Sequence, residues 1–302
     1  MQQINSISQF HQLLSLPESL HPLVSVVRVE DIKLNPTTDW EHFFLNFYTV
    51  SLKRNVQAKA RYGQQYYDFD TGVMSFTAPR QLQSHVMVDQ DSQQEVGRGY
   101  VLLVHPDFLL KSSVLEKINQ YGFFAYALHE ALHLSAREEA DMLEIFRKID
   151  QECQHIDQHT QDIILSQIDL LLSYSNRFYG RQFVTRKAAN KDLLANLERV
   201  LEAYFEKGLG LESGHVSVDY VASQLHVSPS YLSDVLRSLT GQNARQHIQE
   251  KILEKARFYL AATNLSVAEI AYQLGFEHPQ SFNKFFRKKN NTSPLAFRRM
   301  YN

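Results

Sequence analysis

The chain has 302 residues, which is enough for about two domains that each bury a core of their own. With 31 Lys and Arg against 33 Asp and Glu, the net charge of −2 argues against a surface that is basic throughout, and 44% hydrophobic residues exclude a mainly disordered chain. The single cysteine, Cys153, excludes an internal disulfide framework, and the lack of a signal sequence or a membrane-length apolar stretch leads us to expect a cytoplasmic protein.

Residues from about 41 to 104 have the pattern of a β-rich region. Short aromatic and β-branched runs alternate there with turn residues such as Gly and Pro, which is typical of strands joined by tight turns. The runs cover residues 45–52, 66–69, 73–77 and 100–104. Several short strands in one block favour a small barrel or sandwich, and the polar residues 80–98 favour an exposed loop.

The periodicity then changes to that of helices. Ser135–Glu138 has the sequence of a capping box, which predicts a helix that begins there and ends near Cys153. Apolar residues spaced three and four positions apart predict further helices at about 157–178 and 189–206. The apolar faces of the earlier helices make residues 107–187 the candidate segment for dimerisation.

The C-terminal part contains an internal repeat. Residues 217–225 (SVDYVASQL) match residues 266–274 (SVAEIAYQL) at an offset of 49, and residues 232–237 then match residues 282–287 at an offset of 50. One extra residue has therefore entered the second copy, near residues 277–279. Each copy begins with a serine suited to a helix N-cap and has the pattern helix, short turn, helix.

The second helix of each copy has a polar face that suits the major groove of DNA. These helices are predicted at about 229–239 and about 279–289, with apolar residues on the opposite face. Side chains of Ser, Asn, Gln, Lys and Arg are able to read base edges in that groove. The polar faces are Ser230, Ser233, Asp234 and Arg237 in the first copy, and Gln280, Asn283, Lys284 and Arg287 in the second copy.

The segment between the copies predicts a rigid spacer. Residues 243–263 can form one helix of about 20 residues and about 30 Å, which is close to one DNA turn of about 34 Å. Such a spacer lets both second helices enter successive major grooves. Asn291 stands where the first copy has Gly241, and both suit the left-handed conformation that ends a helix. Ser293–Pro294 then predicts the start of a last short helix.

The charge is divided unevenly along the chain. Residues 188–302 carry 14 basic and 11 acidic residues, whereas residues 1–187 carry 17 and 22, so their net charges are +3 and −5. Residues 264–302 hold six basic residues against Glu269 and Glu277. A locally basic C-terminal end fits contact with nucleic acid, and the alternative is a solvated charged face.

Residues from about 188 to 301 resemble the DNA-binding domain of the AraC/XylS family of transcription regulators. The resemblance is carried by SVDYVASQLHVSPSYLSDVLRSLTG (217–241), by Ile252 and Glu254–Ala256 in the spacer, and by SVAEIAYQLGFEHPQSFNKFFRKKNNTSP (266–294). It implies a sequence-specific DNA-binding regulator that inserts both recognition helices into double-stranded DNA. It also implies an N-terminal sensing or dimerising domain, a homodimer, and contacts with RNA polymerase.

The resemblance and the polar faces together assign roles to single residues. Asp234 lies where base-contacting residues of the family often lie, but its carboxylate repels phosphate and suits only a cytosine amino group, so the second copy is favoured for direct readout. Base contacts are predicted for Ser230, Ser233, Asp234, Gln280, Asn283 and Lys284. Contacts to the DNA backbone are predicted for Arg237, Arg287, Lys288, Ser217 and Ser266.

The N-terminal part resembles, more loosely, the cupin-like sensor domains of the same family. The resemblance implies an α+β chain with a small β-barrel at residues 1–106, a helical linker at 107–187 and an all-α domain with two helix-turn-helix units at 188–302. There is no His-x-His pair, so no metal is expected in the barrel. A small-molecule effector is expected among aromatic side chains that could equally form the core of the barrel, namely Tyr62, Tyr66, Phe69 and Phe76.

Residues 129–133 (HEALH) fit the H-E-x-x-H pattern of zinc proteases, which works only when both histidines lie on one helix face. Because the capping box begins at Ser135, we predict no continuous helix through His129 and His133. A zinc-dependent hydrolase is therefore the alternative function, and a protein-interaction module is a further one. We favour a regulator that is not an enzyme and has no catalytic residues, cofactor or metal.

Cys153, His155 and His159 form a second cluster whose spacing would allow a metal or a redox switch. A cysteine on a helical face is more often buried and inert, since its reactivity depends on an accessible thiolate. We predict the inert role for Cys153.

Overall fold

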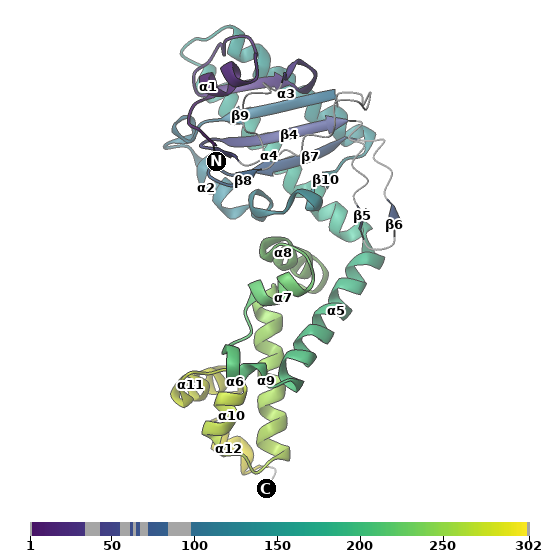
Figure 1. Ribbon diagram of the computed structural model, residues 1–302, viewed down its shortest axis with the longest axis vertical. Helices are drawn as coiled ribbons and strands as arrows, with labels where there is room; N and C mark the ends of the chain where they lie inside the picture. The colour runs from purple at the N-terminus through teal and green to yellow at the C-terminus, as the bar shows by residue number, and fades with distance from the viewer. Residues whose placement is uncertain are drawn as a thin grey trace. The chain divides into compact units, whose positions relative to one another are not determined.

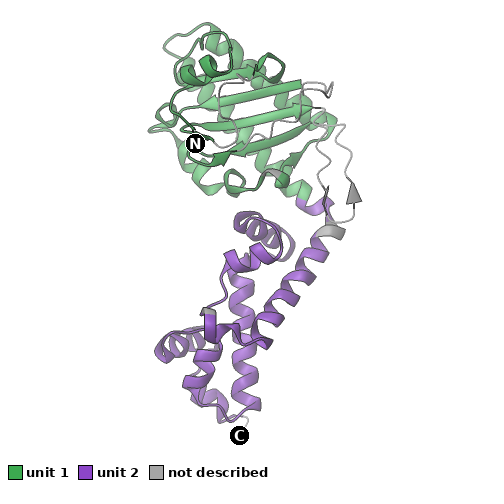
Figure 2. Cartoon of the chain, viewed as in Figure 1, with its two compact units in different colours: residues 1–182 green, residues 183–302 purple. Residues whose placement is uncertain are grey.

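The computed structural model describes residues 2–33, 43–54, 61–62, 65–66, 72–83 and 98–300 of the chain. These residues form two compact units, residues 1–182 and residues 183–302 (Figure 2). In its described residues the first unit combines strands and helices, whereas the second unit is helical throughout (Figure 1). The mixed α+β class predicted from the sequence is therefore confirmed, and a closed barrel stays a prediction.

A five-stranded antiparallel sheet is the framework of the first unit. Its strand order is β10-β7-β4-β9-β2, with β4 and β9 paired over seven residues at its centre. The strands are β2 (Val24–Arg28), β4 (Tyr48–Arg54), β7 (Val73–Thr77), β9 (Arg98–Val104) and β10 (Leu132–His133). Side chains on both faces are buried, which explains the continuous apolar runs such as VLLV in β9.

The single strand predicted at residues 45–52 is wrong, because the chain breaks there into two strands of different sheets. Strand β3 (Phe43–Leu45) ends and β4 begins three residues later. Asn46 stands in the break, where its backbone N–H donates to the carbonyl of Ile4 at 2.9 Å. Phe47, the next residue, is fully buried. The break therefore places an apolar side chain in the core, and so the apolar pattern of the sequence shows no sign of the break.

Two smaller sheets complete the β structure of the described residues. One has the order β1-β3-β8, and the other pairs β5 with β6. The strands are β1 (Gln2–Ile4), β8 (Leu82–Gln83), β5 (Arg61–Tyr62) and β6 (Gln65–Tyr66). A hydrophobic cluster joins β1 and β3 to helix α1 (Ile7–Leu13) and to Val27, Val101 and Leu103 of the large sheet. The two larger sheets therefore share one core.

Two long helices, α3 (Ala136–Gln154) and α4 (Thr160–Thr185), follow the sheet. The predicted capping box is confirmed, since the Ser135 N–H donates to Glu138 at 2.8 Å and the Glu138 N–H donates to Ser135 at 3.4 Å. Helix α3 packs against β2. Shorter helices precede it: η1 (Val29–Asp31), η2 (Pro106–Leu109), α2 (Ser113–Gln120), η3 (Gly122–Ala125) and η4 (Leu128–Glu130).

Helix α9 (Ala244–Ala262) is the central helix of the second unit. Helices α7 and α8 lie at one end of it, and α10, α11 and α12 lie at the other (Figure 1). Its buried side, from Ala244 to Leu260, runs through a single hydrophobic cluster. The remaining helices are α5 (Lys187–Glu206), α6 (Leu209–Ser213), α7 (Val218–Gln224), α8 (Pro229–Thr240), α10 (Val267–Gln273), α11 (Pro279–Asn290) and α12 (Pro294–Arg298). The long spacer helix predicted between the repeats is confirmed.

Candidate nucleic-acid interface

The internal repeat forms two helix-turn-helix units, α7–α8 and α10–α11. The serines predicted as N-caps occupy those positions: the Ser217 hydroxyl accepts from the Tyr220 N–H at 3.0 Å, and the Ser266 hydroxyl accepts from the Glu269 N–H at 3.2 Å. Glu269 completes a capping box by accepting from the Ser266 N–H, and this hydrogen bond lowers the pKa of the Glu269 carboxyl. Local sequence therefore fixes where each unit begins.

The turns of the two units show where the extra residue has entered. After α7 the Val227 N–H donates to the Ala222 carbonyl at 3.1 Å, and after α10 the equivalent Phe276 N–H donates to Ala271 at 2.9 Å. Both first helices therefore end in the same way. Helix α8 then begins at Pro229, whereas α11 begins at Pro279, so Glu277 is the inserted residue. Since the turn absorbs it, both second helices keep their faces.

Buried residues on one side of each recognition helix direct its polar side outward. Leu232 and Leu236 of α8 and Phe282 and Phe286 of α11 are fully buried in the core of the unit. The predicted contact residues lie on the other side. In α11 they are all exposed, namely Gln280, Asn283, Lys284, Arg287 and Lys288.

Helix α8 differs from α11 in charge and in exposure. Ser230, Ser233 and Asp234 are only half-exposed. Asp234 also pairs with Arg237, one turn further on, at 2.7 Å, so the one cation of α8 faces a carboxylate. Helix α11 carries four cations and no acidic residue. The positive charge expected of a phosphate-binding surface is therefore concentrated on the second copy.

One predicted base-reading side chain is folded back on its own helix. The Asn283 amide nitrogen donates to the Pro279 carbonyl at 2.9 Å, one turn earlier. Pro279 is the first residue of α11 and its carbonyl lies in the first turn. Asn283 must exchange this hydrogen bond for one to a base if it reads DNA, and the exchange costs part of the energy gained.

Sequence reasoning missed an ion-pair cluster that fixes α5 against α9. Lys251 of α9 lies 3.1 Å from Glu202 of α5 and 3.1 Å from Glu254, and Lys255 also binds Glu202. The hydrogen bond from Lys255 is the largest cause of a lowered pKa at Glu202. Burial alone would lower the pKa of Lys251, but hydrogen bonds to Glu202 and Glu254 outweigh burial and raise it. The spacing of charges within α9 gave no signal of a partner on α5.

Two arginines hold the second copy in place. Arg257 of α9 donates to the Asn290 side chain at the end of α11, with its nearer nitrogen at 2.5 Å. Arg298 of α12 donates to the carbonyls of Leu260 at 3.2 Å and Leu265 at 2.6 Å. The Arg298 guanidinium is therefore bonded to the protein itself, although Arg298 is one of the six basic residues of the segment 264–302.

The ends of the second copy follow the sequence prediction. Asn291 adopts a left-handed backbone with φ of 57°, as Gly241 does with φ of 78°. The Ser293 hydroxyl caps α12 by accepting from the Ala296 N–H at 3.2 Å. These local signals were readable because they depend on neighbours within four residues.

The zinc-protease pattern lacks the helix it requires. His129 belongs to the single turn η4, His133 to strand β10, and α3 begins only at Ala136. The predicted break between the two histidines is confirmed. Glu130 is fully buried and accepts from the Ala127 N–H at 2.6 Å. Among the described residues, no group of three His, Cys, Asp or Glu side chains has the arrangement of a metal site.

The predicted aromatic pocket is described only in part. Phe76 of β7 is buried and packs against the rings of Phe123, Phe124 and Tyr179, with centroids 4.5–6.2 Å away, so it forms core. Tyr62 and Tyr66 lie in the paired strands β5 and β6. Phe69 lies outside the described residues.

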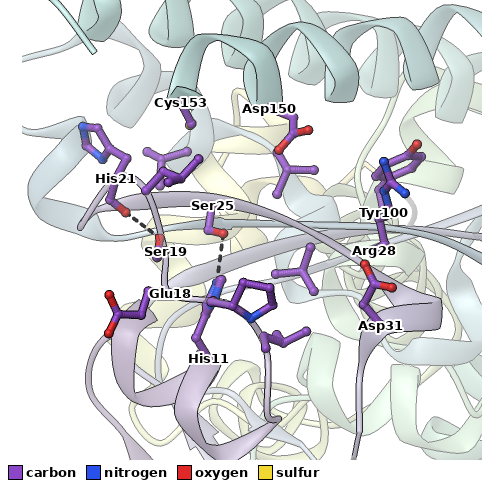
Figure 3. A pocket seen from close by; sticks show the side chains of 16 residues that line it. His11, Glu18, Ser19, His21, Ser25, Arg28, Asp31, Tyr100, Asp150 and Cys153 are labelled. Atoms are coloured by element: carbon purple, nitrogen blue, oxygen red, sulfur yellow. Dashed lines mark hydrogen bonds between the residues drawn. The ribbon is translucent and has the colours of Figure 1, made fainter. Parts of the chain in front are cut away.

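A cavity of about 200 Å³ lies elsewhere in the first unit, along the edge strand β2 between the chain after α1 and helix α3 (Figure 3). The His11 ring bonds to the Ser25 hydroxyl there at 3.0 Å. Cys153 faces the same space and is 5% exposed. Burial raises the pKa of the Cys153 thiol to about 12, and the prediction that this cysteine is buried is confirmed.

Comparison with known proteins agrees with the geometry of the second unit. Residues 221–300 match the family model described as "Helix-turn-helix domain". The chain is 27% identical over 189 residues to "Uncharacterized HTH-type transcriptional regulator YfiF" of Bacillus subtilis (strain 168), covering 62% of this chain and 57% of that protein. It is 35% identical over 83 residues to "HTH-type transcriptional activator RhaS" of Escherichia coli O1:K1 / APEC, covering 28% and 30%. The C-terminal part of this chain is thus an AraC-type helix-turn-helix domain.

The similarity is narrower than the whole chain. The chain spans 57% of the length of the first relative and 44% of a second, "Uncharacterized HTH-type transcriptional regulator YijO" of Escherichia coli (strain K12), to which it is 28% identical over 131 residues or 43% of this chain. The solved DNA-binding domain of AdpA, in complex with a target DNA, is 26% identical and covers 36% of this chain and 91% of its own, with a TM-score of 0.31. None of the described helices is long and apolar enough to cross a membrane.

Proposed function

We propose that the chain is a sequence-specific transcription regulator that binds double-stranded DNA through α8 and α11. The observation that carries this proposal is the face of α11, where Lys284, Arg287 and Lys288 are exposed opposite the fully buried Phe282 and Phe286. A helix of this kind fits the major groove, and its cations neutralise phosphates. The AraC-type domain and the transcriptional regulators among the curated relatives support the same function.

The residue roles follow from the two faces. We assign base contacts to Gln280, Asn283 and Lys284 of α11 and to Ser230, Ser233 and Asp234 of α8. Contacts to the DNA backbone go to Arg237, Arg287, Lys288, Ser217 and Ser266. The two serines already cap helices, so their part is to present the helix N-terminus, with its free N–H groups, to a phosphate.

We assign the first unit a regulatory role. The proposal divides the chain into a cupin-like sensor at residues 1–106, a helical segment at 107–187 and the DNA-binding domain at 188–302. A small-molecule effector is proposed to bind near Tyr62, Tyr66 and Phe69, with Phe76 contributing core rather than pocket wall. RNA polymerase is proposed as a further partner, on the resemblance alone.

The chain is further proposed to dimerise through helix α4. The apolar side chains that suggested dimerisation by α3 are used internally, since Met142 and Phe146 are fully buried in their own unit. Helix α4 instead exposes Ile163 and Leu170, both by 42% and seven residues apart. Seven-residue spacing keeps apolar side chains on one side of a helix that pairs with another helix. A second copy of α4 is the partner that such a row fits.

The DNA-binding proposal predicts two different mutational effects. Arg287→Ala should weaken binding to all sequences alike and reduce the salt dependence of log K by about 1, because one phosphate contact is lost. Asn283→Ala should instead relax specificity at one base position by about 1–3 kcal/mol. Both are measured by fluorescence anisotropy with operator and mismatched duplexes over a salt series.

The matched control is Lys148→Ala, which removes an exposed cation from α3 of the first unit. We expect it to leave both affinity and salt dependence unchanged. If Arg287→Ala and Lys284→Ala bind DNA as the unmodified chain does, the assignment of α11 as a recognition helix is wrong.

A further inference from the structure

The cavity of the first unit lies at the free edge of the five-stranded sheet. Strand β2 is the last in the order β10-β7-β4-β9-β2, and among the described strands it pairs with β9 alone. The cavity follows this edge, between the chain after α1 and helix α3 (Figure 3). An engineered cavity of about 150 Å³ binds benzene, so a volume of about 200 Å³ holds a ligand of about eight non-hydrogen atoms.

The backbone of β2 offers both donors and acceptors along this edge. The His105 N–H donates to the Leu23 carbonyl at 2.8 Å, so this pair begins the ladder between β2 and β9. Hydrogen-bonded and non-hydrogen-bonded pairs alternate in an antiparallel ladder, and therefore the N–H and C=O groups of Val24, Val26 and Arg28 point away from β9. Such an edge suits a ligand that carries both a donor and an acceptor.

Several polar groups of the cavity wall are bonded to one another. The His11 ring bonds to the Ser25 hydroxyl at 3.0 Å through Nε2 and to the Pro17 carbonyl through Nδ1. The Ser19 hydroxyl donates to the His21 carbonyl at 2.7 Å. His11 and Ser25 are each only 7% exposed. These groups shape the wall, and recognition of a ligand falls to the groups without partners.

Two opposite charges in the wall have no partner. Asp150 of α3 and Arg28 of β2 both line the cavity, and neither forms a hydrogen bond or an ion pair with another described residue. Arg28 lies opposite Tyr100, whose ring packs near Phe146 of α3 with centroids 6.0 Å apart, so Arg28 is on the α3 side of the sheet. Burial raises the pKa of the Asp150 carboxyl, and the charge of Arg28 offsets this only in part.

The Cys153 thiol is a further group without a partner. Cys153 follows Asp150 by three residues on α3, and both side chains point from α3 toward β2 (Figure 3). Cys153 is 5% exposed, and no described residue forms a hydrogen bond with it. Val24 and Val26 line the same space. Because a buried thiol behaves as a small hydrophobic group, this part of the cavity suits an aliphatic side chain.

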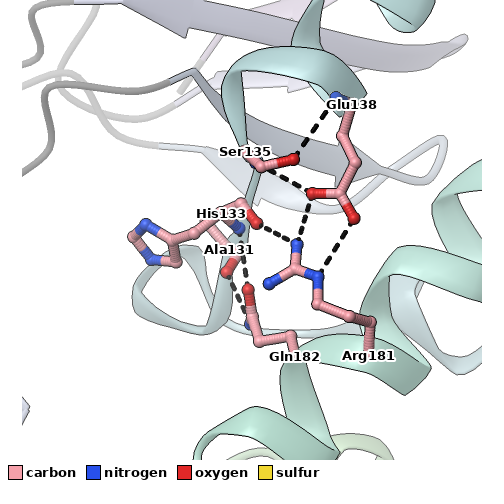
Figure 4. Close-up of polar contacts among 6 residues, drawn as sticks. All are labelled: Ala131, His133, Ser135, Glu138, Arg181 and Gln182. Carbon is pink, nitrogen blue, oxygen red and sulfur yellow. Dashed lines mark hydrogen bonds and ion pairs between the residues drawn. The ribbon is translucent and has the colours of Figure 1, made fainter.

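Helix α3 presents Asp150 and Cys153 from a fixed position. At its N-terminal end the Arg181 guanidinium pairs with Glu138 at 2.7 Å and donates to the His133 carbonyl at 2.7 Å (Figure 4). The Gln182 side chain accepts from the His133 N–H at 2.8 Å. These bonds fix the start of α3 to helix α4. A wall that is formed before the ligand arrives lowers the entropic cost of binding.

We propose that this cavity binds a small aliphatic α-amino acid, with its ammonium group on Asp150, its carboxylate on Arg28 and its side chain against Cys153. A zwitterion pairs both charges of the wall at once. An amine leaves Arg28 without a partner, and a carboxylic acid does the same to Asp150. The site differs from the one proposed near Tyr62 and Tyr66, since neither of these lines the cavity.

Isothermal titration calorimetry of the full chain tests this site with three probes that share one carbon skeleton. They are L-leucine, isopentylamine, which lacks the carboxylate, and 4-methylpentanoate, which lacks the amino group. The unmodified chain is expected to bind one L-leucine per chain, about 10-fold or more tighter than either analogue, because each analogue leaves one charge unpaired. L-Valine, which is smaller by one methylene group, should bind as well.

Asp150→Asn and Arg28→Gln locate the two ends of the ligand. Asp150→Asn should lose the preference for L-leucine over 4-methylpentanoate, and Arg28→Gln should lose the preference over isopentylamine. Each preference compares two probes on one protein, so a general loss of stability does not imitate the result. Asp141→Asn is the matched control, because it removes a carboxylate from α3 outside the cavity wall and should bind all probes as the unmodified chain does.

Three results would each overturn the site. The first is that neither L-leucine nor L-valine binds the unmodified chain. The second is that isopentylamine or 4-methylpentanoate binds as tightly as L-leucine, and the third is that Asp150→Asn and Arg28→Gln keep the preferences of the unmodified chain. No DNA is present in these titrations, so none of these results bears on the function proposed for α8 and α11. Conversely, a failure of DNA binding would leave the expected titrations unchanged.

Discussion

The second residue after the first helix of each repeat has a left-handed backbone in both copies, but only the second copy has glycine there. His226 has φ of 55° and Gly275 has φ of 84°. A Cβ atom on Gly275 would overlap the carbonyl oxygen of Gly214, whereas the His226 side chain is exposed. Equivalent positions in the two copies therefore differ in what they accept. Position 275 requires glycine, whereas position 226 accepts a side chain.

This difference predicts opposite effects of exchanging the residues. Gly275→Ala should destabilise the full chain by more than about 1 kcal/mol, because it adds both a strained φ and a steric overlap. His226→Gly should leave stability unchanged or raise it by up to about 1 kcal/mol, because the left-handed strain is relieved. Thermal unfolding followed by circular dichroism measures both. An unchanged midpoint for Gly275→Ala would mean that the approach of Gly214 is not a feature of the native domain.

The hydrogen-bond partner of a single polar side chain cannot be predicted from the sequence. The sequence identifies Asn283 and Asp234 as polar residues on recognition helices. It does not reveal that the Asn283 amide is bonded to Pro279 or that Asp234 neutralises Arg237. Both partners lie within one turn of the helix, but which rotamer a side chain chooses depends on solvent and neighbours as well as spacing.

Among the helices, the cluster of Lys251, Lys255 and Glu202 joins α5 to α9 and so connects the start of the domain to its spacer. Glu202 is the acceptor shared by both lysines. Its side chain is 37% exposed, so solvent and salt weaken each pair. The shared geometry fixes the angle between two helices more than it contributes to the free energy of unfolding.

The lowered pKa of Glu202 predicts an acid-sensitive contribution to stability. The ionised carboxylate is favoured in the folded chain, so its stabilisation is present above the ordinary pKa of 4.5 and is lost as pH falls through the lowered value. Glu202→Gln should therefore be less stable than the unmodified chain at pH 7, by less than about 1 kcal/mol. The two should converge once the pH falls below the lowered pKa of Glu202.

Thermal unfolding at a series of pH values and low salt checks this prediction. Glu254→Gln is the control, because Glu254 lies on α9 itself, contacts only Lys251 of the two lysines and is 65% exposed. We expect a smaller effect from it. A difference between the unmodified chain and Glu202→Gln that does not narrow as the pH falls below 4.5 would argue against ionisation of Glu202 as the cause.

At the level of helices and strands, the sequence predicted what depends on local signals. The caps at Ser135, Ser217 and Ser266 and the spacer helix were readable because each depends on residues at most a few positions apart. The break at Asn46 and the ion pairs between Glu202 of α5 and the lysines of α9 were not readable. Each of them joins segments distant in the chain, and the composition of a segment does not say which distant partner a residue meets.

Across the whole molecule, charge is divided between the parts of the chain. Residues 1–187 carry a net charge of −5 and residues 188–302 one of +3, which gives the small total of −2, although the exposed cations of α11 are grouped on one helix. Four cations on one helix give limited non-specific affinity, because affinity of that kind grows with the number of phosphates neutralised. A second copy of the chain on the same DNA would double the number.

The proposed homodimer predicts a change in mass on substitution of the α4 row. Leu170→Glu places a charge beside Ile163, one row further along α4, and we expect it to convert the dimer into a monomer, because burying an unpaired carboxylate costs more than the contact gains. Light scattering measures the mass directly. The salt dependence of DNA binding should also fall by about half, since half of the phosphate contacts are lost.

Leu110→Glu serves as the control. Leu110 is 55% exposed, lies in the first unit and is not part of α4, so its substitution should leave the mass unchanged. If the unmodified chain already has the mass of a monomer, the α4 row has another role and the homodimer is rejected.

Helix α9 also determines which changes of chain length the domain tolerates. Glu277, inserted in the turn before α11, leaves the faces of α11 intact. The same insertion within α9 would rotate the following elements by about 100° and advance them by about 1.5 Å, because each residue of an α-helix adds a fixed rotation and a fixed rise. One added residue there would turn α11 away from the major groove that follows the one proposed for α8. The turns can therefore change in length without changing the faces of the helices. In the spacer, only insertions or deletions of whole helical turns keep the orientation of α11 relative to α8.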